Sequence, residues 1–191
     1  MMNHIGTNTI ETKRLILRRF VQDDAESMKR NWVADPAVQN GYGEPTYITI
    51  RQIHDLLDVY IGKYKNDDYY RFGIFEKEST ECIGQIAFFL VDVKNHFAEI
   101  EYCIGRAFQR RGYATEAARA VIDYGFDKIH LHKVQICHRE SNFASGKVID
   151  KCGLYYEGML RDYFYLDGKY EGRKYYSMLE NERPQYWHLL D

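Results

Sequence analysis

A glycine-containing turn with two arginines has the residue types best suited to chemistry, here the binding of a phosphate. It follows a strand-like segment, residues 97–105, and precedes a helix-like segment, residues 115–129. The first amides of a helix have no partner within it, and together with the helix dipole they attract anions. Gly112 lets a ligand approach the backbone because it has no Cβ, while Arg110 and Arg111 add donors that suit phosphate. The predicted phosphate site comprises Gln109, Arg110, Arg111, Gly112, Tyr113, Ala114 and Thr115.

Two carboxylates in the preceding strand are candidates for a general base. Glu99 and Glu101 alternate with apolar residues, so both side chains lie on one face of the strand. A carboxylate held in place beside apolar neighbours can accept a proton from a reacting group. The alternative is that this face is solvated, or paired with arginine or lysine. The two glutamates are therefore candidates for a general base, and the sequence alone does not distinguish this role from a solvated face or an ion pair.

The spacing of the turn, Gln109-x-x-Gly112-x-Ala114, resembles the signature with which GNAT N-acetyltransferases bind the pyrophosphate of acetyl-CoA. It is neither a Rossmann fingerprint nor a Walker A loop. Further stretches are similar to the branch of that family containing the ribosomal-protein N-terminal acetyltransferases, namely Thr12 to Arg18, Asn142 to Leu154, Leu160 to Tyr165 and Asp167 to Tyr170. The resemblance covers residues 10 to 181, with the matches in the family's order.

This resemblance implies a mixed α/β fold. Its central sheet is mostly antiparallel, has helices on both faces, and splays at a V-shaped cleft for acetyl-CoA. The implied activity is direct transfer of the acetyl group from acetyl-CoA to a primary amine, with acetyl-CoA as co-substrate and no metal. Cys103 and Ile104 are placed against the pantetheine arm, and backbone amides of residues 103–105 are expected to stabilise the oxyanion. The resemblance favours Glu99 as the base, with Glu101 or water as alternatives.

The general acid departs from the commonest pattern of the family. Many members carry a tyrosine seven residues after the asparagine that starts the second helix, and here that position is Ile149, which cannot donate a proton. The resembling branch carries a serine three residues after the asparagine. Ser145 is therefore a candidate to hydrogen-bond the CoA sulfur, or is simply a small residue in the first turn. Asn142 is a preferred N-cap, a role compatible with contacting the cofactor.

Hydrophobic periodicity predicts the elements that must position these residues. Strands are expected at residues 14–19, 71–76, 81–91, 97–105 and 133–138 and around Tyr163 and Tyr175, and helices at 23–32, 50–64, 115–129 and 142–152. Gly153 is expected in the left-handed conformation at the end of the last helix. Asp35-Pro36 and the glycines near Pro45 are interpreted as chain breaks. Residues 33–49 are therefore predicted to form a long loop between two helices.

In the family that the sequence resembles, this region forms one wall of the acceptor cleft. The loop is therefore predicted to be ordered, to line the acceptor side of the cleft and to decide substrate choice. Loops of this length are usually functional or disordered. Tyr42 and Glu44 are the candidate substrate-binding residues, and acidic and tyrosine side chains suit a cationic amine. The expected acceptor is a protein N-terminus or a small cationic amine. The alternative function is a non-catalytic acyl-CoA-binding regulatory module that keeps the cofactor turn without the chemistry.

The composition is that of a single globular domain over residues 1–191, with 45% hydrophobic and 28% charged residues. A net charge of −2 gives no electrostatic footprint for nucleic acid. No apolar run is long enough to span a membrane and no secretory leader is recognised, so we expect four free thiols in the cytoplasm. The histidines near Cys137 match no standard zinc spacing. The sequence does not distinguish a monomer from a homodimer.

Overall fold

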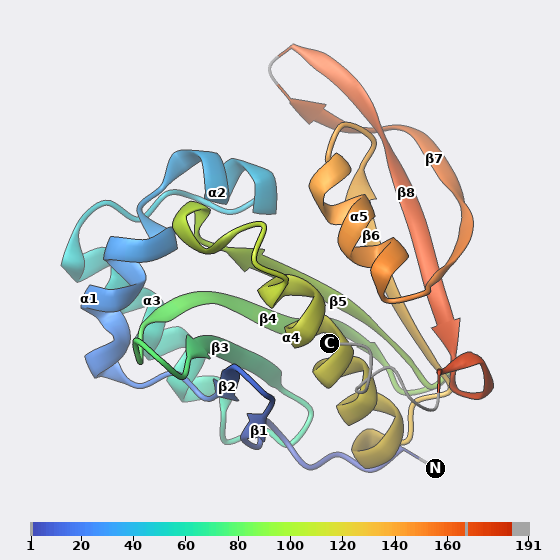
Figure 1. Ribbon diagram of the computed structural model, residues 1–191, viewed down its shortest axis with the longest axis horizontal. Helices are drawn as coiled ribbons and strands as arrows, with labels where there is room; N and C mark the ends of the chain where they lie inside the picture. Colours follow the sequence, from blue (N-terminus) through green and yellow to red (C-terminus); the bar gives the residue numbers. More distant parts are fainter. Residues whose placement is uncertain (1, 167, 185–191) are drawn as a thin grey trace.

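An eight-stranded sheet forms the centre of the protein (Figure 1). The computed structural model describes residues 2–166 and 168–184, and the side chain of Tyr42 lies outside the described part, as does Asp167. The spatial order of the strands is β1-β2-β3-β4-β5-β6-β8-β7. The strands are β1 (Ile10–Glu11), β2 (Leu15–Arg18), β3 (Tyr70–Glu76), β4 (Cys82–Asp92), β5 (Phe97–Ile104), β6 (Lys133–Arg139), β7 (Tyr155–Leu166) and β8 (Lys169–Leu179).

Helices cover both faces of this sheet. The α-helices are α1 (Ala25–Met28), α2 (Pro36–Tyr42), α3 (Ile50–Lys63), α4 (Tyr113–Tyr124) and α5 (Phe143–Lys151). Shorter helical turns are η1 (Gln22–Asp24), η2 (Lys29–Val33), η3 (Arg106–Phe108), η4 (Gly125–Ile129) and η5 (Glu180–Glu182). Alternation along β5 separates two buried layers: Ile104 packs in the cluster that contains Val121 of α4, and Cys103 packs in the cluster that contains Leu57 of α3.

The sheet splays apart between β5 and β6. These two strands run parallel, whereas the other neighbouring strands pair antiparallel. Their pairing ends at Ile100↔Ile136, although β5 continues to Ile104 and β6 to Arg139. Beyond that point each strand keeps its outer partner, β4 for β5 and β8 for β6. The predicted mixed α/β fold with a V-shaped opening is thus confirmed.

Most predicted elements lie where periodicity placed them, with boundaries shifted by a few residues. The helix after the phosphate-binding turn begins at Tyr113, two residues earlier than predicted, because Gly112 is its N-cap. Gly153 is left-handed, as predicted, with φ of +71°. Asn142 caps α5 by accepting a hydrogen bond from the Ser145 amide at 3.1 Å.

The prediction of a continuous loop over residues 33–49 is wrong, because this segment contains helix α2. Asp35 caps that helix by accepting from the Ala37 amide at 3.0 Å, and Pro36 occupies its first turn. Gly43 ends it in the left-handed conformation, with φ of +87°. Asp-Pro and Gly occur at the start and end of helices as well as in turns. In this segment they mark the two ends of a helix.

Candidate active site

The cofactor turn has the backbone geometry of an anion site. Gly112 has φ of +84°, a conformation that favours glycine, and a Cβ built there would lie 3.2 Å from Nη2 of Arg14. The first hydrogen bond within α4 runs from the Glu116 amide to the Gly112 carbonyl at 3.0 Å. The amides of residues 113–115 precede that bond and are directed out of the helix end. The turn therefore offers several backbone donors at the positive end of a twelve-residue helix.

A buried carboxylate fixes this helix end to the rest of the protein. Glu116 accepts hydrogen bonds from Thr12 Oγ1 at 2.6 Å, from the Arg14 amide at 2.8 Å and from Arg14 Nε at 2.7 Å. Arg14 also donates from Nη1 to the Arg111 carbonyl at 2.8 Å. Burial alone would raise the pKa of Glu116, but these hydrogen bonds outweigh it and lower the pKa below its usual value. The link ties the start of β2 to the turn before α4.

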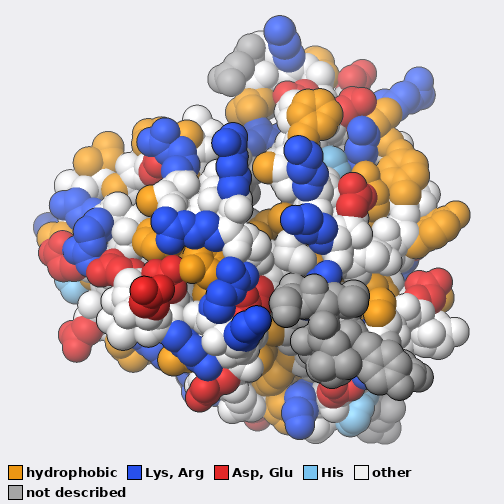
Figure 2. All heavy atoms as spheres, viewed as in Figure 1, with side chains coloured by type: hydrophobic (Ala, Val, Ile, Leu, Met, Phe, Trp, Pro, Cys, Tyr) orange, Lys and Arg blue, Asp and Glu red, His pale blue; other side chains and the backbone are white. Residues whose placement is uncertain are grey.

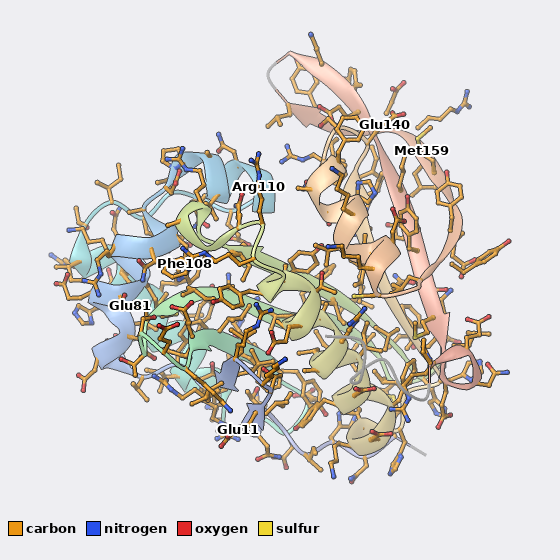
Figure 3. All side chains as sticks on the ribbon, in the orientation of Figure 1. Glu11, Glu81, Phe108, Arg110, Glu140 and Met159 are labelled. Carbon is orange, nitrogen blue, oxygen red and sulfur yellow. The ribbon has the colours of Figure 1, made fainter. Side chains whose placement is uncertain are left out.

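The two arginines of the turn have different surroundings. Arg111 faces Glu76, with Nη1 3.7 Å from its Oε1, and its guanidinium lies over the Phe108 ring at 5.5 Å. Tyr113 donates its hydroxyl hydrogen to Glu76 as well. Arg110, by contrast, lines the cleft, and Figure 3 shows it with Phe108 on the loop between β5 and α4. Of the two, Arg110 is the one placed to meet a ligand.

A cavity of about 660 Å³ opens in front of this turn, between α2, α4 and α5. It is lined by every residue that the sequence predicted for the cofactor except Arg111, namely Cys103, Ile104, Gln109, Arg110, Gly112, Tyr113, Ala114, Thr115, Asn142 and Ser145. The sequence reasoning missed Lys147 and Lys151, four residues apart on α5, which also line it. Figure 2 shows Lys and Arg side chains gathered on the face that carries α2, α4 and α5. We call this space the cofactor cavity.

The open edge of β5 borders the cofactor cavity. The Gly105 amide donates to the Ile83 carbonyl on β4 at 2.8 Å. Because amides alternate in direction along a strand, those of Tyr102 and Ile104 point to the opposite edge, into the splay. Gln109 Nε2 donates to the Ile104 carbonyl at 2.9 Å, which agrees with that direction. The same alternation turns the Cys103 amide toward β4, so Tyr102 and Ile104 rather than Cys103 offer backbone donors to a ligand.

A second cavity of about 490 Å³ shares part of its lining with the first. We call it the acceptor cavity. Asn40, Gly43 and Glu44, at the end of α2 and just after it, form one wall, and Phe164, Tyr165 and Leu166 of β7 form another. Glu101 and Cys137 line it between these walls. The segment after α2 thus borders this cavity, while Ala37 and Val38 earlier in α2 line the cofactor cavity.

Tyr102 and Ser145 lie where the two cavities meet. The two cavities have four lining residues in common, Gly41, Tyr102, Asn142 and Ser145. The hydroxyl groups of Tyr102 and Ser145 are hydrogen-bonded at 2.8 Å. Nothing in the sequence pointed to Tyr102, because it lies 43 residues before Ser145 and only the fold brings them together.

Both candidate bases are paired with arginine. Glu101 accepts from Arg71 Nη2 at 2.6 Å, and it lines the acceptor cavity. Glu99 is buried, accepts from Arg173 Nη2 at 2.5 Å and from Gln135 Nε2 at 2.7 Å, and lines neither cavity. The two carboxylates share one face of β5, as predicted, but only Glu101 borders the space that a substrate can enter.

Two further titratable groups lie at the acceptor cavity. Burial raises the pKa of Glu44, and the nearby charge of Glu101 raises it further, against the opposing effect of Arg71. His138 donates from Nδ1 to the Arg139 carbonyl at 2.6 Å, a pairing that requires Nδ1 to carry the proton. Its buried Nε2 has no hydrogen-bond partner among the described residues. The acceptor cavity is therefore edged by an acidic group and by a histidine that the sequence reasoning did not select.

Within the described ranges, no group of three His, Cys, Asp or Glu side chains is placed to hold a metal ion. All four cysteines are free thiols. No helix in the described part of the chain is long and apolar enough to cross a membrane.

Comparison with known proteins identifies the fold and its site. Residues 14–155 match the family model described as an acetyltransferase (GNAT) domain. The chain belongs to the GNAT acetyltransferase family. This GNAT protein is 31% identical over 174 residues to an N-acetyltransferase named p20 of Bacillus licheniformis, an alignment that covers 91% of this chain and 97% of that one.

Two other relatives of this GNAT protein have names that state a substrate. A spermidine N(1)-acetyltransferase of Escherichia coli is 26% identical over 148 residues, which are 78% of this chain and 72% of that protein. The solved structure of RimL, a ribosomal L7/L12 alpha-N-protein acetyltransferase in complex with coenzyme A, superposes with a TM-score of 0.80 at 20% identity, covering 90% of this chain and 98% of that one. The chain is accordingly an acetyl-CoA-dependent N-acetyltransferase.

Proposed function

We propose that this N-acetyltransferase transfers the acetyl group directly to a primary amine, which is either a protein N-terminus or a small cationic amine. The observation that carries the proposal is the junction of two cavities at Tyr102 and Ser145. One cavity ends at an anion-binding helix start, and the other is edged by Glu44 and Glu101. A donor and an acceptor would therefore meet where the two cavities share their lining, without a covalent enzyme intermediate.

The cofactor cavity would bind acetyl-CoA through the turn before α4. The amides of residues 113–115 and Arg110 would meet the pyrophosphate. The pantetheine arm would run along the open edge of β5 in the place of a neighbouring strand. The amides of Tyr102 and Ile104 would donate hydrogen bonds to it. Lys147 and Lys151 add positive charge along the α5 wall. An acetyl thioester placed in this way has its carbonyl beside backbone donors, which favours the negative charge that develops there.

The amine must lose a proton before it can attack. Glu101 is the better placed of the two candidate carboxylates, because it borders the acceptor cavity whereas Glu99 is enclosed by Arg173 and Gln135. Glu101 would act through a water, since its ion pair with Arg71 occupies one of its oxygens. Glu99 would then position Arg173 at the cavity wall. The raised pKa of Glu44 adds a second proton-binding group near the entering ammonium.

The relatives with named substrates support an amine acceptor of either kind. One is named for spermidine and another for the N-terminus of a ribosomal protein. The non-catalytic alternative is disfavoured, because a module that only binds acyl-CoA has no use for a second cavity that opens onto the end of the first.

A panel of amines tests the proposal. CoA release from acetyl-CoA would be followed with polyamines, aminoglycosides and N-terminal peptides of varied first residue. We expect saturable turnover with one class of primary amine and none with secondary amines or alcohols. Absence of turnover with every amine, in a protein that binds acetyl-CoA by calorimetry, would favour the regulatory module instead.

A further inference from the structure

Two phenylalanines that line the acceptor cavity lie at irregularities of the sheet, one on each side of the splay. Phe89 belongs to β4 and Phe164 to β7, and both line this cavity. In the order of the strands, β4 lies beside β5, whereas β7 is the outermost strand beyond β6 and β8 (Figure 1). Bulges next to active sites redirect side chains away from the regular alternation of a strand. Each of these two irregularities therefore needs to be examined for the side chain that it presents.

Phe89 is the extra residue of a bulge in β4. Phe88 opposes Ile100 on β5, and the next residue that has an opposite partner is Leu90. The seven residues of β4 before Phe89 are all buried, but the side chain of Phe89 is 44% exposed. No ring or cation among the described residues stacks on it. A large apolar ring exposed at a cavity in this way is available to a ligand.

Phe164 follows a larger bulge in β7. Leu160 opposes Arg173 on β8. Phe164 opposes Glu171, so three residues of β7 face a single residue of β8. The half-buried ring of Phe164 lies edge-on to that of Tyr163, with centroids 4.9 Å apart, and Arg173 Cζ is 5.9 Å from its centroid. Because neighbours on two sides fix its orientation, this ring offers a preformed apolar surface to the cavity.

The charges of the cavity lining suit one ammonium group and no more. Of the two acids that line it, Glu101 is paired with Arg71 at 2.6 Å, whereas Glu44 has no ion pair among the described residues. Arg139, which also lines the cavity, donates from Nη2 to the Asn40 carbonyl and not to a carboxylate. A second ammonium on the acceptor would find no further unpaired carboxylate in the described lining and would be repelled by Arg139. The part of the acceptor beyond its reacting amine is therefore expected to be uncharged.

We propose that Phe89 and Phe164 form an aromatic clamp that makes the enzyme selective for primary monoamines that carry an aromatic group. The inference rests on the proposed function and names the substrate class of the same site. The ammonium would lie near Glu44 and Glu101, and the aromatic group would pack edge-on or offset against the two phenylalanine rings. A free arylalkylamine has this chemistry, and so does the first residue of a peptide that begins with phenylalanine.

Binding of amines to the protein saturated with CoA tests the clamp without turnover, because CoA carries no acetyl group to transfer. Calorimetry would compare 2-phenylethylamine with spermidine, and a tripeptide that begins with phenylalanine with the same tripeptide that begins with serine. In each pair we expect the aromatic ligand to bind about tenfold more tightly. The tighter of the two aromatic ligands identifies whether a free amine or a peptide is the source. Binding of spermidine as tight as that of 2-phenylethylamine, with no preference between the peptides, would overturn the clamp.

Variants of the two rings supply the second arm. Phe89→Ala and Phe164→Ala should each weaken binding of the aromatic ligand about tenfold, and leave the affinities for spermidine and acetyl-CoA nearly unchanged. Phe164→Leu keeps apolar volume in the half-buried position, so it tests the loss of the ring in a protein whose packing is preserved. Undiminished binding of the aromatic ligand in the folded variants of both positions would also overturn the clamp.

Tyr155→Ala is the matched control. It removes a ring of β7 that is 70% exposed and lines neither cavity, so it should keep every affinity. Turnover then separates the two proposals. If aromatic amines bind but no amine is acetylated, the proposed function fails and the clamp stands. If polyamines are acetylated with a higher kcat/KM than aromatic amines, the clamp fails and the proposed function stands.

Discussion

Arg14 holds Glu116 and the Arg111 carbonyl at the same time, so one guanidinium connects the first turn of α4 to the turn that precedes it. Its Nη2 also lies 2.7 Å from Glu116 Oε2, the oxygen that accepts from Nε, and the side chain of this glutamate is only 7% exposed. Arg14 itself lines neither cavity. The shape of the anion site therefore depends on a residue that need not touch the ligand.

Replacing Arg14 by Met should consequently weaken both the fold and cofactor binding. The buried Glu116 loses its charged partner, which we expect to cost about 1–3 kcal/mol in the free energy of unfolding. The affinity for acetyl-CoA should fall with it, measured by calorimetry. Lys77→Met is the control, since Lys77 pairs with the exposed Glu11 at 3.3 Å, and surface pairs contribute about 0–1 kcal/mol. Equal losses in the two variants would contradict the special position of Arg14.

The lowered pKa of Glu116 predicts a pH dependence of stability. A carboxyl whose pKa is lower in the folded than in the unfolded state stabilises the fold above its ordinary value, 4.5 here. That contribution is lost as the pH falls through the folded pKa. Urea unfolding of the wild type and Glu116→Gln should therefore differ most at neutral pH, and the difference should shrink below about pH 4.5. A difference that stays constant into the acid range would rule out the ion pair as its source.

Gly112→Asp should abolish measurable binding of acetyl-CoA. The substitution places a side chain with φ of +84° and a negative charge where the pyrophosphate would lie. A left-handed non-glycine residue costs about 1–2 kcal/mol in addition, so calorimetry should be paired with a thermal unfolding curve. Gly62→Asp is the matched control, because a Cβ at Gly62 meets nothing within 4 Å. Unchanged affinity in a folded Gly112→Asp protein would remove this turn from the cofactor site.

The two strand glutamates should differ in their effect on the reaction. Glu101→Gln is expected to lower kcat by about 10²-fold and to leave the affinity for acetyl-CoA nearly unchanged. Glu99→Gln should mainly destabilise the fold, since it leaves Arg173 without its charged partner in a site where that arginine is 13% exposed. An unchanged kcat in Glu101→Gln, with a loss of kcat of about 10²-fold in a folded Glu99→Gln protein, would return the base to Glu99.

Glu44 should affect the binding of the acceptor amine and not the binding of acetyl-CoA. Glu44→Gln is expected to raise the KM for a cationic amine about 5–10-fold, by removing a charge from the cavity edge, and to leave the KM for acetyl-CoA unchanged. Glu140→Gln serves as the control, because Glu140 is an exposed acid that lines neither cavity (Figure 3). A change in the KM for acetyl-CoA alone would assign this segment to the cofactor side.

Local chemistry in the sequence was enough to predict the strand, turn and helix around Gly112 and most other elements. Gly112 and the capping Asn142 act through neighbours within a few residues, so their roles can be inferred from spacing. The alternation of Glu99 and Glu101 also predicted the face that they share, but not the arginines that pair with them. Arg71 and Arg173 lie 30 and 74 residues away from those glutamates, and nothing local marks them as partners.

Two features needed the three-dimensional fold. The position of Tyr102 between the two cavities follows only from the fold, in which α5 lies across the end of β5. No residue pattern in the sequence predicts that arrangement. Helix α2 was missed for a different reason, since Asp35-Pro36 begins a helix as readily as it breaks one. The following residues decide between these outcomes, and a segment of only seven helical residues has too short a hydrophobic pattern to do so.

The splay of the sheet also bears on how the molecule holds together. Past Ile100 and Ile136, the strands β6 and β8 with α5 continue beside β5 without backbone pairing to it. A molecule bridging α4 and α5 acts there as a cross-link between two lobes, in place of the strand hydrogen bonds that the splay omits. Because such a ligand binds only the assembled lobes, its occupancy adds about 2.7 kcal/mol to folding at a hundredfold excess over Kd. Uptake of the acetyl donor is therefore expected to stabilise the fold against unfolding.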